Sequence, residues 1–128
     1  METMKIQGRD YAKVQDRLAE AHKAHGELSI ITEMTIIDTE KNIFSFKASV
    51  ITAKGEFTGH SLKSLKAPKD FEKAETIAVG RALAMAGYMS DGAIASYEEV
   101  EDYLKQKAYE TVQEWPTVKI PQNTQWKN

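Results

Sequence analysis

The segment that most constrains this chain is Phe71–Tyr88, whose sequence FEKAETIAVGRALAMAGY has the spacing of an alanine-rich amphipathic helix. Four alanines recur at every fourth position and so form one stripe on the helix: Ala74, Ala78, Ala82 and Ala86. Small side chains let a helix backbone lie close against a sheet or a second helix. Lys73 and Arg81 stand beside the stripe, on a helix with little other polar surface after its first turns. The pattern predicts a closely packed helix and leaves open whether its cations belong to the scaffold or to a binding surface.

The length and composition are those of a single soluble globular domain. A chain of 128 residues buries roughly two-thirds of its unfolded surface, and 41% hydrophobic with 28% charged residues fits this class. The lack of cysteine excludes disulfides, thiolate catalysis and cysteine metal sites. No apolar run approaches the roughly 18 residues that span a bilayer, and the N-terminus has no signal-peptide core. We therefore expect a cytoplasmic protein with no membrane partner.

The charge is distributed unevenly around a formal net value of −2. Residues 41–81 hold eight basic side chains against four acidic ones, whereas residues 91–114 hold seven acidic against two basic ones. A basic middle and an acidic later segment can produce a local binding field on a weakly acidic protein. The same distribution also fits solvated faces of mixed sign, which are normal on soluble proteins.

The hydrophobic spacing predicts one helix, followed by three extended segments. Residues Tyr11–His25 have apolar side chains at helical spacing, with Asp10 placed to cap the helix and Gly26 to end it. Met1–Arg9 is expected to be a loose start. Alternating apolar and polar residues then predict three strands joined by hairpin connections: residues 28–38, 43–52 and 56–65.

The second and third strands predict which side chains share a face. In the second strand four apolar side chains point the same way: Phe44, Phe46, Ala48 and Val50. The third strand alternates more weakly, with Phe57, Gly59 and Ser61 opposite Thr58, His60 and Leu62. A glycine inside a strand suggests close approach of another backbone or of a ligand. We therefore expect such a contact at Gly59.

Two helices and a tail are predicted after the strands. Asp70 is expected to start the alanine-rich helix and Gly87 to end it, before a turn at residues 90–92. A capping box of Ser96 and Glu99 opens a last helix, which Pro116 is expected to stop after residue 115. Residues 116–128 lack periodicity and are predicted to be a flexible tail or a docking arm, so residues 1–115 form the domain. The predicted fold class is α+β, an antiparallel three-stranded meander with an N-terminal helix, the alanine-rich helix and a C-terminal helix on one face.

Catalytic motifs are scarce. His22 and His25 lie three residues apart on the first predicted helix, a spacing that suits a metal or two surface histidines. His60 on the third strand suits a base, a phosphate contact or a half-exposed strand histidine. The sequence has no phosphate loop, nucleophile motif or dinucleotide fingerprint, so we predict no enzyme, no cofactor, and neither catalytic nor metal-binding residues. A small hydrolase or metal-dependent nuclease that uses the histidines and nearby carboxylates is the alternative within that class.

A basic groove is permitted by the predicted layout. Lys47 and Lys63 are expected at exposed strand positions, and Lys66 and Lys69 follow in the next loop. A curved sheet with such a rim, crossed by a helix, suits the backbone of a nucleic acid. Two aromatic residues, Phe57 and Tyr88, are candidates for stacking on bases, although residues of this kind belong more often to the hydrophobic core.

One region resembles a known family. The pattern KAET-x-A-x-GRALA-x-AGY, followed by DG-x-IAS-x-EEV, extends from residue 73 to residue 100. It is similar to a signature of phage-encoded proteins related to the ERF and Sak single-strand annealing proteins. The Thr58–His60 tripeptide and the helix-then-strands layout resemble the same family, so the similarity covers roughly residues 11–100.

The resemblance implies a β-β-β-α annealing core that assembles into rings or helical filaments. It also implies that single-stranded DNA lies in a basic groove between hairpin and helix, held by its phosphates with the bases exposed. By position, Arg81 matches the basic residue before Ala-Leu in the helix, and Lys73 matches the one at the helix start. Gly80 and Ala84 stand where better-known members carry further basic residues, and the chain lacks their long C-terminal recruitment region.

The sequence-level hypothesis is a non-enzymatic single-stranded DNA-binding and annealing protein of phage or prophage recombination, in the cytoplasm of the bacterial host. Its expected partners are single-stranded DNA, further copies of itself and a phage or host recombination or replication protein. The predicted DNA-binding residues are Arg81, Lys73, Lys69, Lys66, Lys63, Lys47, Lys54 and His60. The alternative is a small oligomeric protein-interaction module or inhibitor without DNA binding, which is favoured if Arg81 is buried in an internal ion pair.

Overall fold

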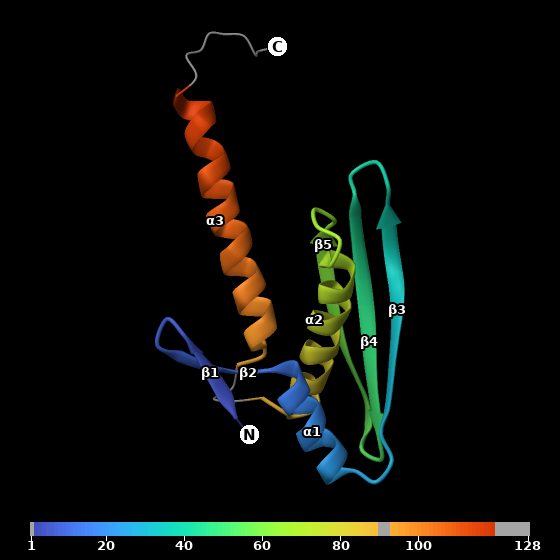
Figure 1. The fold of residues 1–128 in the computed structure, drawn as a ribbon. Helices are drawn as coiled ribbons and strands as arrows, with labels where there is room; N and C mark the ends of the chain where they lie inside the picture. Colours follow the sequence, from blue (N-terminus) through green and yellow to red (C-terminus); the bar gives the residue numbers. More distant parts are fainter. Residues whose placement is uncertain (1, 90–92, 120–128) are drawn as a thin grey trace.

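The computed structural model describes residues 2–89 and 93–119, with side chains as far as residue 108. The elements follow one another along the chain as shown in Figure 1: β1 Thr3–Ile6, β2 Arg9–Ala12, α1 Val14–Ala24, β3 Ser29–Asp38, β4 Ile43–Thr52, β5 Gly55–Ser64, α2 Asp70–Met85 and α3 Tyr97–Lys119. They form a three-stranded sheet, a small two-stranded sheet and three helices, which confirms the predicted α+β class. Within the described residues, no helix is long and apolar enough to cross a bilayer.

The larger sheet is an antiparallel meander in the order β3-β4-β5. Val50 on the central strand pairs with Ile30 on β3 and with Phe57 on β5. A bulge interrupts the register of β3 between Met34 and Ile36. The four side chains predicted to share one face of β4 are all buried: Phe44, Phe46, Ala48 and Val50. The three predicted strands are confirmed, and so is the facing predicted for residues 44–50 and 57–62.

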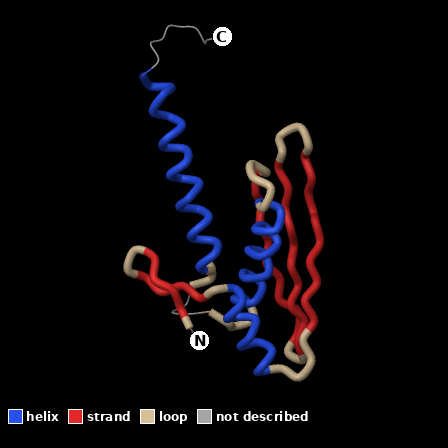
Figure 2. The backbone as a smooth tube through the Cα atoms, in the orientation of Figure 1, coloured by secondary structure: helices blue, strands red, loops and turns tan. Residues whose placement is uncertain are grey.

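Helix α2 lies across this buried face, mainly over β4 and β5 (Figure 2). Ala74, Ala78 and Ala82 have no exposed surface, and Ala86 is partly buried against the same core. A Cβ atom at Gly59 would stand 2.4 Å from the backbone nitrogen of Ala82, so only glycine fits where the helix meets β5. The predicted close-packing stripe and the predicted backbone approach at Gly59 are both confirmed.

The ends of α2 follow the predicted signals. The helix starts at Asp70, and Gly87 adopts a φ of 109°, a left-handed conformation that suits glycine. The Tyr88 N–H donates to the carbonyl of Leu83 at 3.0 Å, which closes the helix in the manner of a Schellman cap.

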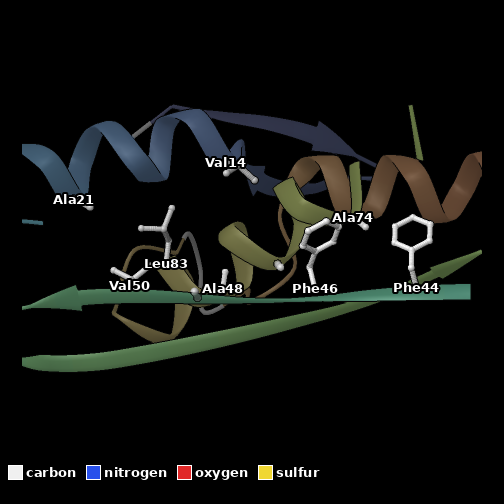
Figure 3. Packing of buried hydrophobic residues seen from close by; sticks show 10 residues of the cluster. Val14, Ala21, Phe44, Phe46, Ala48, Val50, Ala74 and Leu83 are labelled. Carbon is white, nitrogen blue, oxygen red and sulfur yellow. The ribbon is translucent and has the colours of Figure 1, made fainter. Parts of the chain in front are cut away.

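Helix α1 forms the outer layer, against the side of α2 that faces away from the sheet. A Cβ atom at Gly80 would lie 2.7 Å from Cγ2 of Val14, so the two helices also approach closely. Figure 3 shows Val14 and Ala21 of α1 on one side of Leu83, with Val50 of the sheet on the other. One apolar core therefore joins sheet, α2 and α1.

The N-terminus is a hairpin, so the predicted loose start is wrong. β1 and β2 pair around Gln7 and Gly8, whose φ values of 51° and 84° are the left-handed pair that a two-residue hairpin turn uses. Asp10 is therefore a strand residue that accepts a hydrogen bond from Lys5 at 3.0 Å, and it does not cap α1. The prediction failed because Gln-Gly is a weaker turn signal than Asn-Gly.

The first helix starts later than predicted, at Val14 and not at Tyr11. Its N-cap residue, Lys13, makes no side-chain capping bond. The carboxylate of Glu98, on α3, accepts the Val14 N–H at 3.0 Å. The side chain of Glu98 thus caps α1 in place of Asp10, the residue predicted to do so.

The Ser96 half of the predicted capping box of α3 is confirmed, because the Glu99 N–H donates to Ser96 Oγ at 3.3 Å, whereas both carboxylate oxygens of Glu99 accept from Arg81. The helix continues to Lys119, so the predicted stop at Pro116 is wrong. Proline removes one backbone hydrogen bond and kinks a helix, but it does not always end it. The predicted turn at residues 90–92 and residues 120–128 of the predicted tail lie outside the described residues.

Candidate nucleic-acid interface

Six of the eight predicted DNA-binding residues lie along one seam, between α3 on one side and α2 with the edge of β5 on the other. A cavity of about 390 Å³ occupies the seam and is lined by His60, Lys63 and Arg81 opposite Glu99 and Asp102. Two smaller cavities, of about 220 and 240 Å³, continue it past the start of α2. Three predicted cations line these smaller cavities: Lys66, Lys69 and Lys73.

Arg81 is the central cation of the seam. Its Nη2 and Nε atoms donate to the two carboxylate oxygens of Glu99 at 2.6 and 3.1 Å, a bidentate pair with strong geometry. The Arg81 side chain remains 42% exposed. Arg81 therefore closes an internal ion pair that links α2 to α3, and it keeps one side open to solvent.

Lys63 is buried, so the prediction of an exposed strand position is wrong. It faces the core side of β5, opposite Phe44 in the register, and only 4% of its side chain is exposed. Its Nζ atom lies 2.6 Å from a carboxylate oxygen of Asp102 and 3.8 Å from one of Asp70. A buried ammonium requires such partners, and α3 supplies the nearer one.

Asp70 anchors the start of α2 and stays ionised. Burial alone would raise its pKa, but the backbone N–H groups of Lys66 and Ala67, together with the cations Lys63 and Lys73, hold the pKa below its ordinary value. Both N–H groups donate to the same carboxylate oxygen at 2.8 Å. The basic loop before α2 is thereby folded onto the helix start.

The remaining seam cations are more accessible. Lys73 is 45% exposed and its Nζ lies 3.9 Å from Asp102. Lys66 and Lys69 lie in the exposed loop before α2, and His60 is exposed on β5. These four side chains line the same pockets as Lys63 and Arg81, or the pockets next to them.

Two predicted residues lie elsewhere. Lys47 is on the central strand, on the sheet face opposite α2, where Glu33 and His60 are its cross-strand neighbours. Lys54 is exposed in the turn between β4 and β5, at the opposite end of these strands from the loop that leads into α2. The structure therefore does not bring these two lysines into the seam.

The acidic start of α3 was missing from the predicted site. Glu99 and Asp102 pair with Arg81 and Lys63, and Glu98 caps α1. The sequence did show an acidic segment here, and an internal ion pair of Arg81 was one alternative, with no partner named for it. In the structure that partner is Glu99, so the seam has both signs of charge.

Arg17 is a second residue that sequence reasoning missed. It is fully buried, and its guanidinium donates to the carbonyl of Gly80 at 2.7 Å and to those of residues 93–95 at 2.9–3.1 Å. Burial lowers its pKa, while Glu98 and Glu99 act in the opposite direction. An arginine between Val14 and Ala21 on the apolar face of α1 is the signal that could have found it. Arg17 positions the segment that leads into α3.

The histidines and aromatic residues have ordinary surroundings. His22 is exposed near the end of α1, and His25 meets the ring of Tyr88 edge to face, with 6.1 Å between ring centroids. Phe57 faces the core side of the sheet, and Tyr88 packs against the hydrophobic core. Over the part of the chain that the structure describes, no group of three or more potential metal ligands occurs.

Comparison of the chain with protein-family models, with curated proteins and with solved structures finds no match.

Proposed function

We propose that this protein binds single-stranded DNA through the phosphate backbone and promotes strand annealing as an oligomer. The observation that carries the proposal is a row of three cations, with Lys69 at the N-cap of α2 and Lys73 and Arg81 on the helix. Their spacings are multiples of four residues, so they share one helix face. Four residues advance a helix by about 6 Å, so the row presents positive charges about 6 and 12 Å apart along its axis.

A row of this kind suits a sequence-independent contact. Phosphate contacts fix the position of a strand without reading its bases, and annealing needs the bases free to pair. Lys73 and Arg81 are each almost half exposed, so both can reach a phosphate from the seam. The resemblance of residues 73–100 to ERF- and Sak-related annealing proteins supports the same function.

Assembly accounts for the small number of cations in each subunit. Linked weak sites bind far more tightly than one site, because each later contact is effectively intramolecular. A formal net charge of −2 is compatible with this, since binding follows the local field and not the net charge.

The direct test is fluorescence anisotropy of a labelled oligothymidine, together with mass measurement of the protein with and without it. We expect binding at low salt that weakens steeply as salt increases, through counterion release, and larger assemblies when DNA is present. Lys73→Ala should weaken binding more than Lys54→Ala, which removes the same charge from an exposed turn outside the seam. An absence of binding at low salt would exclude the function.

A second candidate is an oligomeric protein-interaction module or inhibitor without DNA binding. The internal pair between Arg81 and Glu99 favours it, because this pair occupies the cation that the first proposal needs most. Exposed apolar side chains on the uncovered face of the sheet favour it too, namely Ile31, Ile36 and Leu62. Stable oligomers that form without DNA and ignore the oligonucleotide would support this candidate over the first.

A further inference from the structure

Helix α3 is attached to the rest of the molecule by polar contacts. The hydrophobic core has buried members from α1, β4 and α2, and no residue of α3 belongs to it within the described part of the chain. Charged and polar groups of α3 make the contacts instead: Glu98 with the Val14 N–H, Glu99 with Arg81, and Asp102 with Lys63 and Lys73. Detaching α3 would therefore leave that apolar core covered.

The boundary between α3 and the rest of the molecule also contains open pockets, of about 390, 220 and 240 Å³. Side chains therefore fill this boundary only in part. Figure 1 shows α3 rising away from the sheet beyond its first turns. The contacts of Glu98, Glu99 and Asp102 with the rest of the molecule all lie in the first two turns of the helix.

The carboxylates of α3 occupy positions that suit phosphate oxygens. Arginine pairs with carboxylate and phosphate through the same two-pronged geometry, and Glu99 already holds both the Nε and Nη2 donors of Arg81. Asp102 likewise forms an ion pair with Lys63 and lies close to the ammonium group of Lys73. A DNA strand in the seam would have to replace these carboxylates.

We propose that α3 is an autoinhibitory clasp: its Glu99 and Asp102 cover the cations of α2 and β5, and phosphates displace them when DNA binds. This inference rests on the proposed function. A protein whose binding-competent state is a minor fraction has its apparent affinity reduced by that fraction. An open state populated at about one part in ten would therefore weaken binding about tenfold.

The first test changes one charge at the clasp and compares it with a matched control. Glu99→Gln removes the carboxylate charge that holds Arg81, so we expect about tenfold tighter binding of labelled oligothymidine. Glu101→Gln removes the same charge two residues along, but Glu101 pairs with Lys105 and Tyr97 of α3 itself. The control should bind nearly like the unaltered chain. Equal tightening in both variants would indicate general charge repulsion and overturn the clasp.

The second test measures the opening itself. The chain has no cysteine, so Leu62→Cys with Tyr103→Cys gives one unique pair for spin labels. Both side chains are exposed, at 69% and 60%, and they line the same cavity from β5 and from α3. Adding oligothymidine should shift the distribution of distances between the two spin labels to longer values. About 0.5 M salt without DNA should produce a smaller shift in the same direction.

The outcomes separate the two proposals. If neither the unaltered chain nor Glu99→Gln binds DNA, the proposed function fails. If DNA binds while the label distance and the Glu99→Gln affinity stay unchanged, the function stands and the clasp is wrong.

Discussion

Helices α2 and α3 both lie beside strand β5, and different interactions hold them there. Helix α2 presents small side chains to the sheet, so that its backbone almost touches Gly59. Helix α3 presents carboxylates to Lys63 and Arg81 across a seam that contains cavities. Dispersion and apolar burial depend little on salt, whereas salt screens ion pairs, the partly exposed pair of Arg81 and Glu99 more than the buried pair of Lys63 and Asp102. The contrast suggests a rigid sheet with one fixed helix and one helix that solution conditions can release.

The largest expected effect comes from a substitution that disturbs the packing of α2 on the sheet. Gly59→Ala places a Cβ atom 2.4–2.7 Å from three atoms of α2, two of them backbone, so the helix must shift. We expect the free energy of unfolding to fall by about 3 kcal/mol or more, measured by urea denaturation.

Gly26→Ala is the matched control for this change. A Cβ atom at Gly26 meets no atom within 4 Å, so its free energy of unfolding should change by no more than about 0.5 kcal/mol. A Gly59→Ala protein as stable as this control would show that α2 is not closely packed on β5.

The next effect breaks the α3 side. Asp102→Asn leaves the buried ammonium of Lys63 with Asp70 as its carboxylate partner, 3.8 Å away. Removing one member of a buried pair costs about 3–5 kcal/mol, and the retained Asp70 places this change near 3. Thermal unfolding of the Asp102→Asn variant is compared with that of the Glu101→Gln control, and we expect a lower melting temperature for Asp102→Asn. Equal melting temperatures would contradict the assigned role of Asp102.

Much of the α2 side of the molecule could be predicted from sequence, because periodicity and glycine placement are local signals. Alternation identified the buried face of β4, and Gly59 indicated the close approach of another backbone or of a ligand, which in the structure is the backbone of α2. Extending the same alternation by two residues places Lys63 beside Ser61 on the core side, so its burial was available from the pattern and was overlooked. The N-terminal hairpin was missed for want of a strong turn signal at Gln7.

The α3 side could not be predicted in the same way. The carboxylate that pairs with Arg81 is determined by the position of the segment that joins α2 to α3. Buried Arg17 holds this segment in place by donating to the carbonyls of residues 93–95. No local pattern specifies an ion pair between residues far apart in sequence. The basic and acidic segments could therefore be recognised in the sequence, but the ion pairs between them could not.

The smallest expected effect sharpens the comparison through pH. The pKa of Asp70 in the folded chain lies below its ordinary value of 3.8. Its contribution to stability is therefore present above the unfolded pKa and is lost as pH falls below about 3.8 through the folded pKa. Asp70→Asn should flatten the acid limb of a stability profile between pH 5 and pH 2 (about the range over which such carboxylates titrate). An acid limb as steep as that of the unaltered chain would assign the loss to other carboxylates.

The central claim, that charge holds α3 and apolar packing holds α2, is tested most directly by native-state hydrogen exchange without DNA, at about 0.05 and 0.5 M salt. The Debye length shortens from well above 10 Å towards about 4 Å over this range. A helix that has lost its contacts with the rest of the protein is only marginally stable in water. We predict that amides of Val100 to Lys107 exchange several-fold faster at the higher salt, while amides of Ala78 to Leu83 keep their rates. Equal protection of both helices, unchanged by salt, would contradict the account.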